Sequence, residues 1–180
     1  MKKPKSNKTL VVNLLAGPGA GKSTMAASIF SELKWKGIDC ELATEFAKDL
    51  VWEERHKTFE NQIYIFGKQH HRIFRLMGQV DVIITDSPLL LTSMYDREQR
   101  TSLRQLVFGE VNKCWNLNVF INRKKKYNPN GRNQTKRQAK AIDTRLKTFL
   151  NDNDVPYIQI EGTHQGVHDV VAAVIKQIKT

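Results

Sequence analysis

The chain has 180 residues, which suits a single domain over residues 1–180 and suffices to bury a core of its own. Its composition, with 40% hydrophobic residues, 26% charged residues and a formal net charge of +11, is that of a soluble globular protein that attracts anions. It contains no apolar run near the ~20 residues that cross a bilayer, and no apolar signal-peptide stretch follows its basic N-terminus. We therefore expect a cytoplasmic protein without membrane contact, whose widely spaced Cys40 and Cys114 are free thiols.

The first predicted element is a strand that leads into a glycine-rich loop. Residues 9–15 form an apolar run typical of a strand covered on both faces, and a helix is expected from Lys22 to about Trp35, with Gly37 ending it. Between them stands Ala-Gly-Pro-Gly-Ala-Gly-Lys-Ser-Thr, residues 16–24. A strand, a glycine-rich turn and a helix in this order are the context of a phosphate-binding loop.

This loop predicts a site for a nucleoside triphosphate. Its glycines allow backbone N–H groups to point at phosphate oxygens, and the helix adds its positive N-terminal end. We expect Lys22 to reach the β- and γ-phosphates of ATP and the Ser23 hydroxyl to bind Mg²⁺. Ala16 replaces the first Gly of the usual pattern, a mild departure because Gly17 and Gly19 supply backbone freedom. The expected nucleotide-binding residues are Gly17, Gly19, Ala20, Gly21, Lys22, Ser23 and Thr24.

A carboxylate follows the second predicted strand, residues 38–44. Glu45 stands directly after it and opens a helix expected over residues 46–55. Functional side chains gather at the carboxyl ends of parallel strands, so Glu45 is suited to accept a proton from an attacking hydroxyl or to orient it. A carboxylate in the first turn of a helix also complements the helix dipole without any chemistry, and that alternative stays open.

Helical periodicity returns over residues 59–77. Gln69 and Arg72 are three residues apart on this helix, so we expect them to share a face and to bind the substrate. The amide suits a base or a sugar, and the guanidinium suits an anionic group. A second, apolar face is predicted to consist of Ile63, Phe66, His70, Phe74 and Met77.

The clearest later strand, residues 80–86, ends in Asp86-Ser87-Pro88. A carboxylate at the end of this strand is suited to hold Mg²⁺, directly or through water, opposite Ser23. The alternative role for Asp86 is to cap the turn before Pro88.

The remaining elements alternate between helix and strand. Helices are expected over residues 89–95, 101–113, 135–150 and 167–179, and strands over 117–122 and 157–160. Strands that alternate with helices predict a three-layer α/β fold with a mainly parallel sheet. Residues 123–147 contain ten Lys or Arg and one acidic residue, Asp143. Such a segment attracts a triphosphate or a nucleic-acid backbone, although a solvated helix face produces the same pattern.

Several of these segments together resemble the small P-loop kinases. They are the phosphate loop, Thr44-Glu45-Phe46-Ala47-Lys48, the helix with Gln62 and Gln69, and residues 82–88. The resemblance extends over nearly the whole chain and is to bacteriophage ATP-binding proteins of the AAA type, which are related to nicotinamide riboside kinases and to nucleoside and nucleotide kinases. The basic segment 123–134 resembles the lid that closes over the donor phosphates in these kinases.

The resemblance implies a P-loop NTPase fold with a five-stranded parallel sheet in the order 2-3-1-4-5. It also implies transfer of the γ-phosphate of ATP with Mg²⁺, with Lys22, Glu45 and Asp86 as catalytic residues. Arg123 and Arg132 would brace the transferred phosphoryl group. One departure concerns the acceptor: many nucleotide kinases have Arg after the Asp of the third strand, whereas this chain has Ser87.

The sequence leaves three functions open. The first is a kinase that acts on a nucleoside or a nucleoside monophosphate. The second is a kinase whose acceptor hydroxyl lies on DNA, at a strand end or on a hydroxymethylated base, as the basic segment and the basic N-terminus favour. The third is a P-loop ATPase that acts as a switch on a partner protein. The oligomeric state is also open, a homodimer included.

Overall fold

The computed structural model describes residues 8–124 and 135–179. Its five parallel strands form one sheet in the order β2-β3-β1-β4-β5, which confirms the predicted α/β fold and strand order. The strands are β1 (Leu10–Leu15), β2 (Cys40–Ala43), β3 (Val82–Thr85), β4 (Trp115–Asn122) and β5 (Ile158–Glu161).

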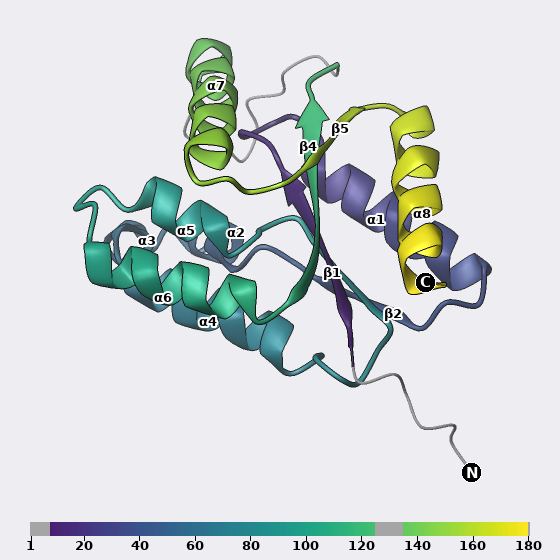
Figure 1. Ribbon diagram of the computed structural model, residues 1–180. Coiled ribbons are helices and arrows are strands. Elements are labelled where there is room, and N and C mark those ends of the chain that lie inside the picture. The colour runs from purple at the N-terminus through teal and green to yellow at the C-terminus, as the bar shows by residue number, and fades with distance from the viewer. Residues whose placement is uncertain (1–7, 125–134, 180) are drawn as a thin grey trace.

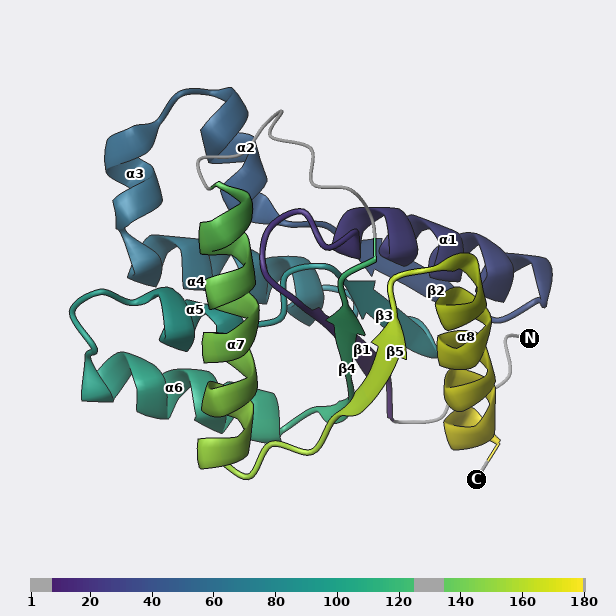
Figure 2. The same ribbon diagram turned by 90° about the horizontal axis from the view of Figure 1, so that it is seen from above.

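The helices form one layer on each face of the sheet (Figures 1 and 2). On one face α1 (Lys22–Trp35) and α8 (His164–Ile178) lie side by side. The helices of the other face are α4 (Gln62–Phe74), α5 (Leu90–Tyr95), α6 (Thr101–Asn112) and α7 (Lys136–Asp152), with α2 (Phe46–Trp52) and α3 (His56–Glu60) beside α4.

Strand β1 lies at the centre of the sheet, and its side chains alternate between two apolar cores. Leu10, Val12 and Leu14 pack under α1 and α8. Val11 and Leu15 point to the core under α4, α5, α6 and α7. Burial of each such side chain contributes about 1.5–3 kcal/mol, so β1 is a firm support for the loop that follows it.

The carboxyl ends of three strands meet at one edge of the sheet. Thr85 at the end of β3 is in register with Asn13 of β1 and with Ala43 of β2. The phosphate loop, Glu45 and Asp86 each follow within a few residues of these positions. They therefore emerge together at this edge, as parallel pairing predicts.

The predicted helix over residues 59–77 differs from the structure. It is divided into α3 and α4, and α4 begins after Asn61, whose side chain accepts a hydrogen bond from the Tyr64 N–H at 3.1 Å. The predicted apolar face is wrong in part, because Ile63 and Phe74 are 53% and 64% exposed, whereas Phe66 is buried and Met77 packs against the core. The buried residues of α4 are Ile65, Phe66, Gln69 and Ile73. Because Gln69 is polar, the sequence pattern did not show that its position belongs to the buried face of α4.

The segment predicted as a lid, residues 123–134, lies outside the described residues beyond Lys124. Both cysteines are free thiols, as predicted, Cys40 buried and Cys114 half-buried. Among the described residues, no helix combines the length and the apolar character that crossing a membrane requires.

Candidate nucleotide-binding site

The phosphate loop connects the buried end of β1 to the first turn of α1. Gly19 and Gly21 have φ angles of 74° and 105°, which glycine adopts without strain and other residues rarely adopt. In the described part of the chain, the N-terminus of α1 has no side-chain cap, and its first turn contains no acidic residue. Its leading N–H groups are thus available, together with the positive end of the helix dipole, for phosphate oxygens.

The side chains of the loop have the placement that a triphosphate requires. The Lys22 ammonium lies back over the loop and donates a hydrogen bond to the Ala16 carbonyl at 2.8 Å. Ser23 and Thr24 are exposed at the start of α1, and Ala20 is buried inside the loop. A lysine held over the loop and an exposed hydroxyl at the helix start are the two side-chain elements of a P-loop.

Gly17 is required for a reason other than backbone freedom. Its φ is not positive, but a Cβ atom at this position would lie 2.7 Å from the Ala139 carbonyl oxygen and 2.7 Å from Asp143 Oδ1. Both neighbours belong to α7, which the loop passes before it turns into α1 (Figure 1). Glycine at this position therefore permits the close approach of α7 to the phosphate loop.

Asp86 lies at the end of β3, with 4% of its surface exposed. Its Oδ1 atom is buried and accepts no hydrogen bond from the described residues. The turn that follows is capped by another side chain, because the Ser87 N–H donates to the Thr85 hydroxyl at 3.1 Å. A buried carboxylate oxygen without a donor fits a magnesium ion or one of its water ligands.

Glu45 is partly buried at the N-cap position of α2, where its side chain makes no capping hydrogen bond. Burial raises the pKa of the Glu45 carboxyl; the Lys22 ammonium opposes this rise, and the Asp86 carboxylate adds to it. These interactions bring Glu45, Lys22 and Asp86 into one electrostatic cluster beside the phosphate loop. A carboxyl group with a raised pKa in such a place is suited to exchange a proton.

Tyr95, at the end of α5, belongs to the same cluster, although the sequence did not single it out. Burial raises the pKa of Tyr95 to about 12, and the negative charge of Glu45 contributes to the rise. The neutral phenol lies within electrostatic reach of the carboxylate on which proton exchange would depend. Its sequence context, a short helix after β3, carries no recognisable motif.

Gln69 of α4 is 2% exposed, and its amide is used inside the protein. Its Oε1 atom accepts a hydrogen bond from the Phe46 N–H at 2.9 Å, and its Nε2 atom donates to the Thr85 hydroxyl at 3.4 Å. Gln69 thus connects the first residue of α2 to the end of β3. Through these two hydrogen bonds Gln69 supports the turn that contains Glu45. Its direct role in substrate binding stays a prediction.

Arg72 also bonds to this turn. Its guanidinium donates to the Thr44 carbonyl at 3.1 Å and to the Thr44 hydroxyl at 3.0 Å, and it forms an ion pair with Asp49 of α2. The same three residues line a cavity of about 420 Å³ at the β2 edge of the sheet. Arg72 therefore lies at the wall of a cavity, as substrate binding requires, but with its charge already paired.

Arg123, at the end of β4, is packed against the phosphate loop. Its Nη1 atom donates to the Pro18 carbonyl at 2.9 Å, and its Nε atom donates to Asp143 Oδ2 at 3.0 Å. The other oxygen of Asp143 accepts a hydrogen bond from the Gly17 N–H at 2.6 Å. Asp143 was not predicted to belong to the site. Its one distinguishing signal in the sequence is that it is the sole acidic residue among ten basic ones in residues 123–147.

The predicted site residues therefore fall into two groups. The phosphate loop, Glu45 and Asp86 come together at the carboxyl edge of the sheet, and Arg123 joins them from β4. Gln69 and Arg72 lie one layer further out, behind the turn after β2. Arg132 lies outside the described residues.

The described part of the chain contains no cluster of three or more His, Cys, Asp or Glu side chains that would hold a metal ion unaided.

Comparisons with known proteins agree with this geometry. The sequence matches the family described as "AAA domain" over residues 11–166. A search of curated proteins finds no matching sequence. Among solved structures, the fold is similar to that of the NadR protein in its crystal structure in complex with NR, with a TM-score of 0.67 and 13% sequence identity. The match covers 96% of this chain and 52% of the NadR chain, so this chain spans about half the length of that protein. The fold is thus that of a P-loop NTPase.

Proposed function

The chain belongs to the AAA domain family, and from this premise we propose that it is a P-loop kinase that transfers the γ-phosphate of ATP to a hydroxyl group of a nucleoside. The observation that carries the proposal is that Glu45, Asp86 and the phosphate loop with Lys22 follow the ends of three neighbouring parallel strands at one edge of the sheet. The loop and Lys22 account for triphosphate binding. Glu45 adds a carboxylate at the place where an acceptor hydroxyl would approach the γ-phosphate.

In the proposed reaction, the acceptor oxygen forms a bond to the γ-phosphorus while the bond from that phosphorus to the bridging β-phosphate oxygen breaks. The hydroxyl proton passes to Glu45, and ADP leaves. Lys22 and the N–H groups of the loop neutralise the charge that develops on the phosphate oxygens. Ser23 and Asp86 would hold Mg²⁺, which supplies further neutralisation of the phosphate charge when it is bound.

The surroundings of Glu45 favour an acceptor without a phosphate group of its own. Ser87 stands where many nucleotide kinases have an arginine, and Arg72 is paired with Asp49. The chain resembles bacteriophage ATP-binding proteins that are related to nicotinamide riboside kinases, and it shares its fold with the NadR protein solved in complex with NR. A nucleoside is therefore the first acceptor to test.

A second candidate acceptor is a hydroxyl on DNA. It is supported by the positive charge of residues 123–147, of which Arg137 and Lys140 on α7 are exposed. An acceptor base inside a duplex would have to be flipped out of its stack, and binding would weaken steeply as salt is added.

Incubation with γ-labelled ATP and Mg²⁺ tests the proposal, with parallel panels of nucleosides, nucleoside monophosphates and duplex DNA. We expect the label on a nucleoside, and we expect transfer to fall about 100-fold when Glu45→Gln replaces the wild type. Label on a nucleoside monophosphate or on DNA would support the kinase activity but show that the acceptor is not a nucleoside. Release of inorganic phosphate at one rate with every panel would favour the ATPase alternative and contradict the kinase.

A further inference from the structure

Asp143 is the point at which three segments of the chain meet beside the phosphate loop. It lies in the second turn of α7, it accepts a hydrogen bond from the Gly17 N–H of the loop, and it pairs with Arg123 of β4. We propose that Asp143 is a positioning residue of the nucleotide site, one that fixes the first half of the loop and holds Arg123 against it. This inference rests on one part of the proposed function, the binding of ATP, and does not depend on transfer to an acceptor.

The two oxygens of the carboxylate have separate partners. Oδ1 accepts from the Gly17 N–H at 2.6 Å, and Oδ2 lies 3.0 Å from Arg123 Nε and 2.9 Å from Arg123 Nη2. The side chains of Arg123 and Asp143 are only 9% and 18% exposed. Charge-assisted hydrogen bonds that are shielded from water in this way are among the stronger contacts of a protein.

Arg123 also donates a hydrogen bond to the phosphate loop. While its Nε atom is held by Asp143, its Nη1 atom donates to the Pro18 carbonyl at 2.9 Å. Two consecutive loop residues, Gly17 and Pro18, are thus fixed by one ion pair, the first through its N–H and the second through its carbonyl. The absent Cβ of Gly17 allows α7 to come this close.

The ion pair also settles the charge balance at the loop. Asp143 is a negative charge near the site of a triphosphate, and Arg123 neutralises it. Removal of Arg123 alone would leave an unpaired carboxylate beside the phosphates, a repulsive arrangement. Removal of the Asp143 charge alone, as in Asp143→Asn, would leave Arg123 without its anionic partner and the Gly17 N–H with a weaker, neutral acceptor. Removal of both would abolish the repulsion and leave only the loosened loop.

This reasoning predicts a pattern that a purely structural tie would not produce. With a fluorescent ATP analogue titrated in the presence of Mg²⁺, we expect Asp143→Asn to weaken binding about tenfold and Arg123→Gln somewhat more. The double variant should bind more tightly than Arg123→Gln alone, so the two effects should not multiply. Circular dichroism melting would confirm that each variant is folded at the temperature of the titration.

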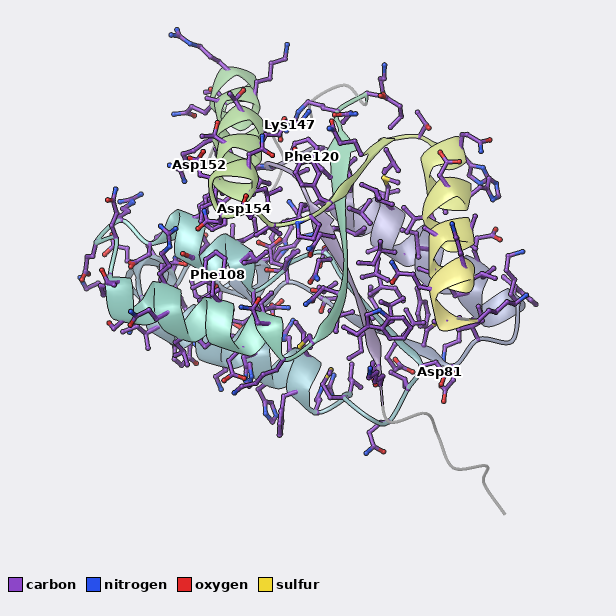
Figure 3. The ribbon with its side chains drawn as sticks, viewed as in Figure 1. Asp81, Phe108, Phe120, Lys147, Asp152 and Asp154 are labelled. Atoms are coloured by element: carbon purple, nitrogen blue, oxygen red, sulfur yellow. The ribbon has the colours of Figure 1, made fainter. Side chains whose placement is uncertain are left out.

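Asp152→Asn is the matched control, because Asp152 is an exposed residue on the same helix, at its far end (Figure 3). It should bind ATP like the wild type. Wild-type affinity in folded Asp143→Asn, or multiplicative losses in the double variant, would overturn the proposal. If Asp143→Asn does not fold, Arg123→Gln decides: a folded protein with unchanged affinity contradicts the inference, and a loss of about tenfold or more supports it.

The failure of the kinase proposal would look different. A wild type that binds ATP and labels no acceptor refutes the kinase, and the affinity series still decides the role of Asp143. A wild type with no affinity for ATP removes both proposals at once.

Discussion

The phosphate loop lies within nine consecutive residues, 16–24, whereas the groups around Glu45 come from β2, α2, α4, α5 and β3. In the proposed function the phosphate loop is the donor side, which binds ATP, and it consists of backbone N–H groups, one helix end and Lys22 from the same segment. The surroundings of Glu45 are the proposed acceptor side. On the acceptor side, Glu45 depends on Gln69 and on its charged neighbours for its position and its pKa. The donor side is therefore a local structure, and the acceptor side is a product of packing.

This difference has a consequence for substitutions. A change in the donor side should act directly on ATP, because little stands between the loop and the phosphates. A change on the acceptor side should act on the hydroxyl substrate, either at Glu45 itself or through the side chains that support it. Measurements that separate the affinity for ATP from the rate of transfer can test whether the two sides are independent.

The largest effect is expected from Lys22→Ala. It removes the cation that would reach the β- and γ-phosphates, so transfer should fall on the order of 1,000-fold and ATP binding should weaken with it. Labelled-ATP transfer and the fluorescent titration measure both quantities. Lys36→Ala, an exposed lysine just after α1, is the control and should behave like the wild type. Undiminished transfer in Lys22→Ala would show that the phosphate loop is not the donor site.

Asp86→Asn should reduce transfer roughly 100-fold or more while the fold persists. The reason is that the amide keeps the shape of the buried side chain but lacks the charge that would hold Mg²⁺. Transfer measured over a magnesium titration should need more Mg²⁺ to reach half of its maximum. Asp152→Asn again provides the control. Unaltered magnesium dependence would show that Asp86 has no part in metal binding.

Sequence patterns predicted the local structure of the phosphate loop almost completely, and the reason is physical. The strand, the glycines, Lys22 and Ser23 are contiguous, and the positive φ angles of Gly19 and Gly21 are what their residue type allows. The order of the strands followed from a family resemblance rather than from periodicity. Gly17 was correctly placed in the loop, but the reason for glycine there, the approach of α7, is a contact between residues 126 apart in the chain.

The acceptor side could be predicted only in part. Glu45 and Asp86 stand at strand ends, where a parallel sheet collects functional groups, so their position alone was informative. Gln69 was predicted from its residue type to meet the substrate, whereas its hydrogen bonds to Phe46 and Thr85 depend on the packing of α4. Tyr95 and Asp143 carry no local signal for the elements they face, because each meets its partners across the fold.

Glu45→Gln should reduce the rate of transfer about 100-fold with ATP affinity little changed, because the amide cannot accept the hydroxyl proton. Activity of the wild type should rise with pH, with a midpoint above the ordinary pKa of a glutamate, since burial raises the pKa of Glu45. Initial rates over a pH series check this midpoint. Glu60→Gln, an exposed residue on α3, is the control.

The same pKa shift affects stability with a definite sign. A raised pKa means that the ionised Glu45 is disfavoured in the folded protein, so this carboxylate lowers wild-type stability as the pH rises through that pKa. Glu45→Gln lacks this loss. It should therefore melt at a higher temperature than the wild type near neutral pH, and the two melting temperatures should converge in acid. Equal melting temperatures at neutral pH would argue that Glu45 is well solvated.

Gln69→Leu should have the smallest effect and should best separate the two sides of the site. It leaves the Phe46 N–H without its acceptor, at a cost of about 1–3 kcal/mol in the free energy of unfolding, and it loosens the turn that carries Glu45. The KM for the acceptor should rise about tenfold at most, with ATP affinity unchanged. Gln105→Leu, exposed on α6, is the control. If the turn positions Glu45 for the acceptor, the acceptor KM will rise together with the drop in melting temperature. A drop in melting temperature with an unchanged KM would contradict this role of Gln69. A fall in ATP affinity would mean instead that the donor side depends on the same packing, and that the two sides form one cooperative structure.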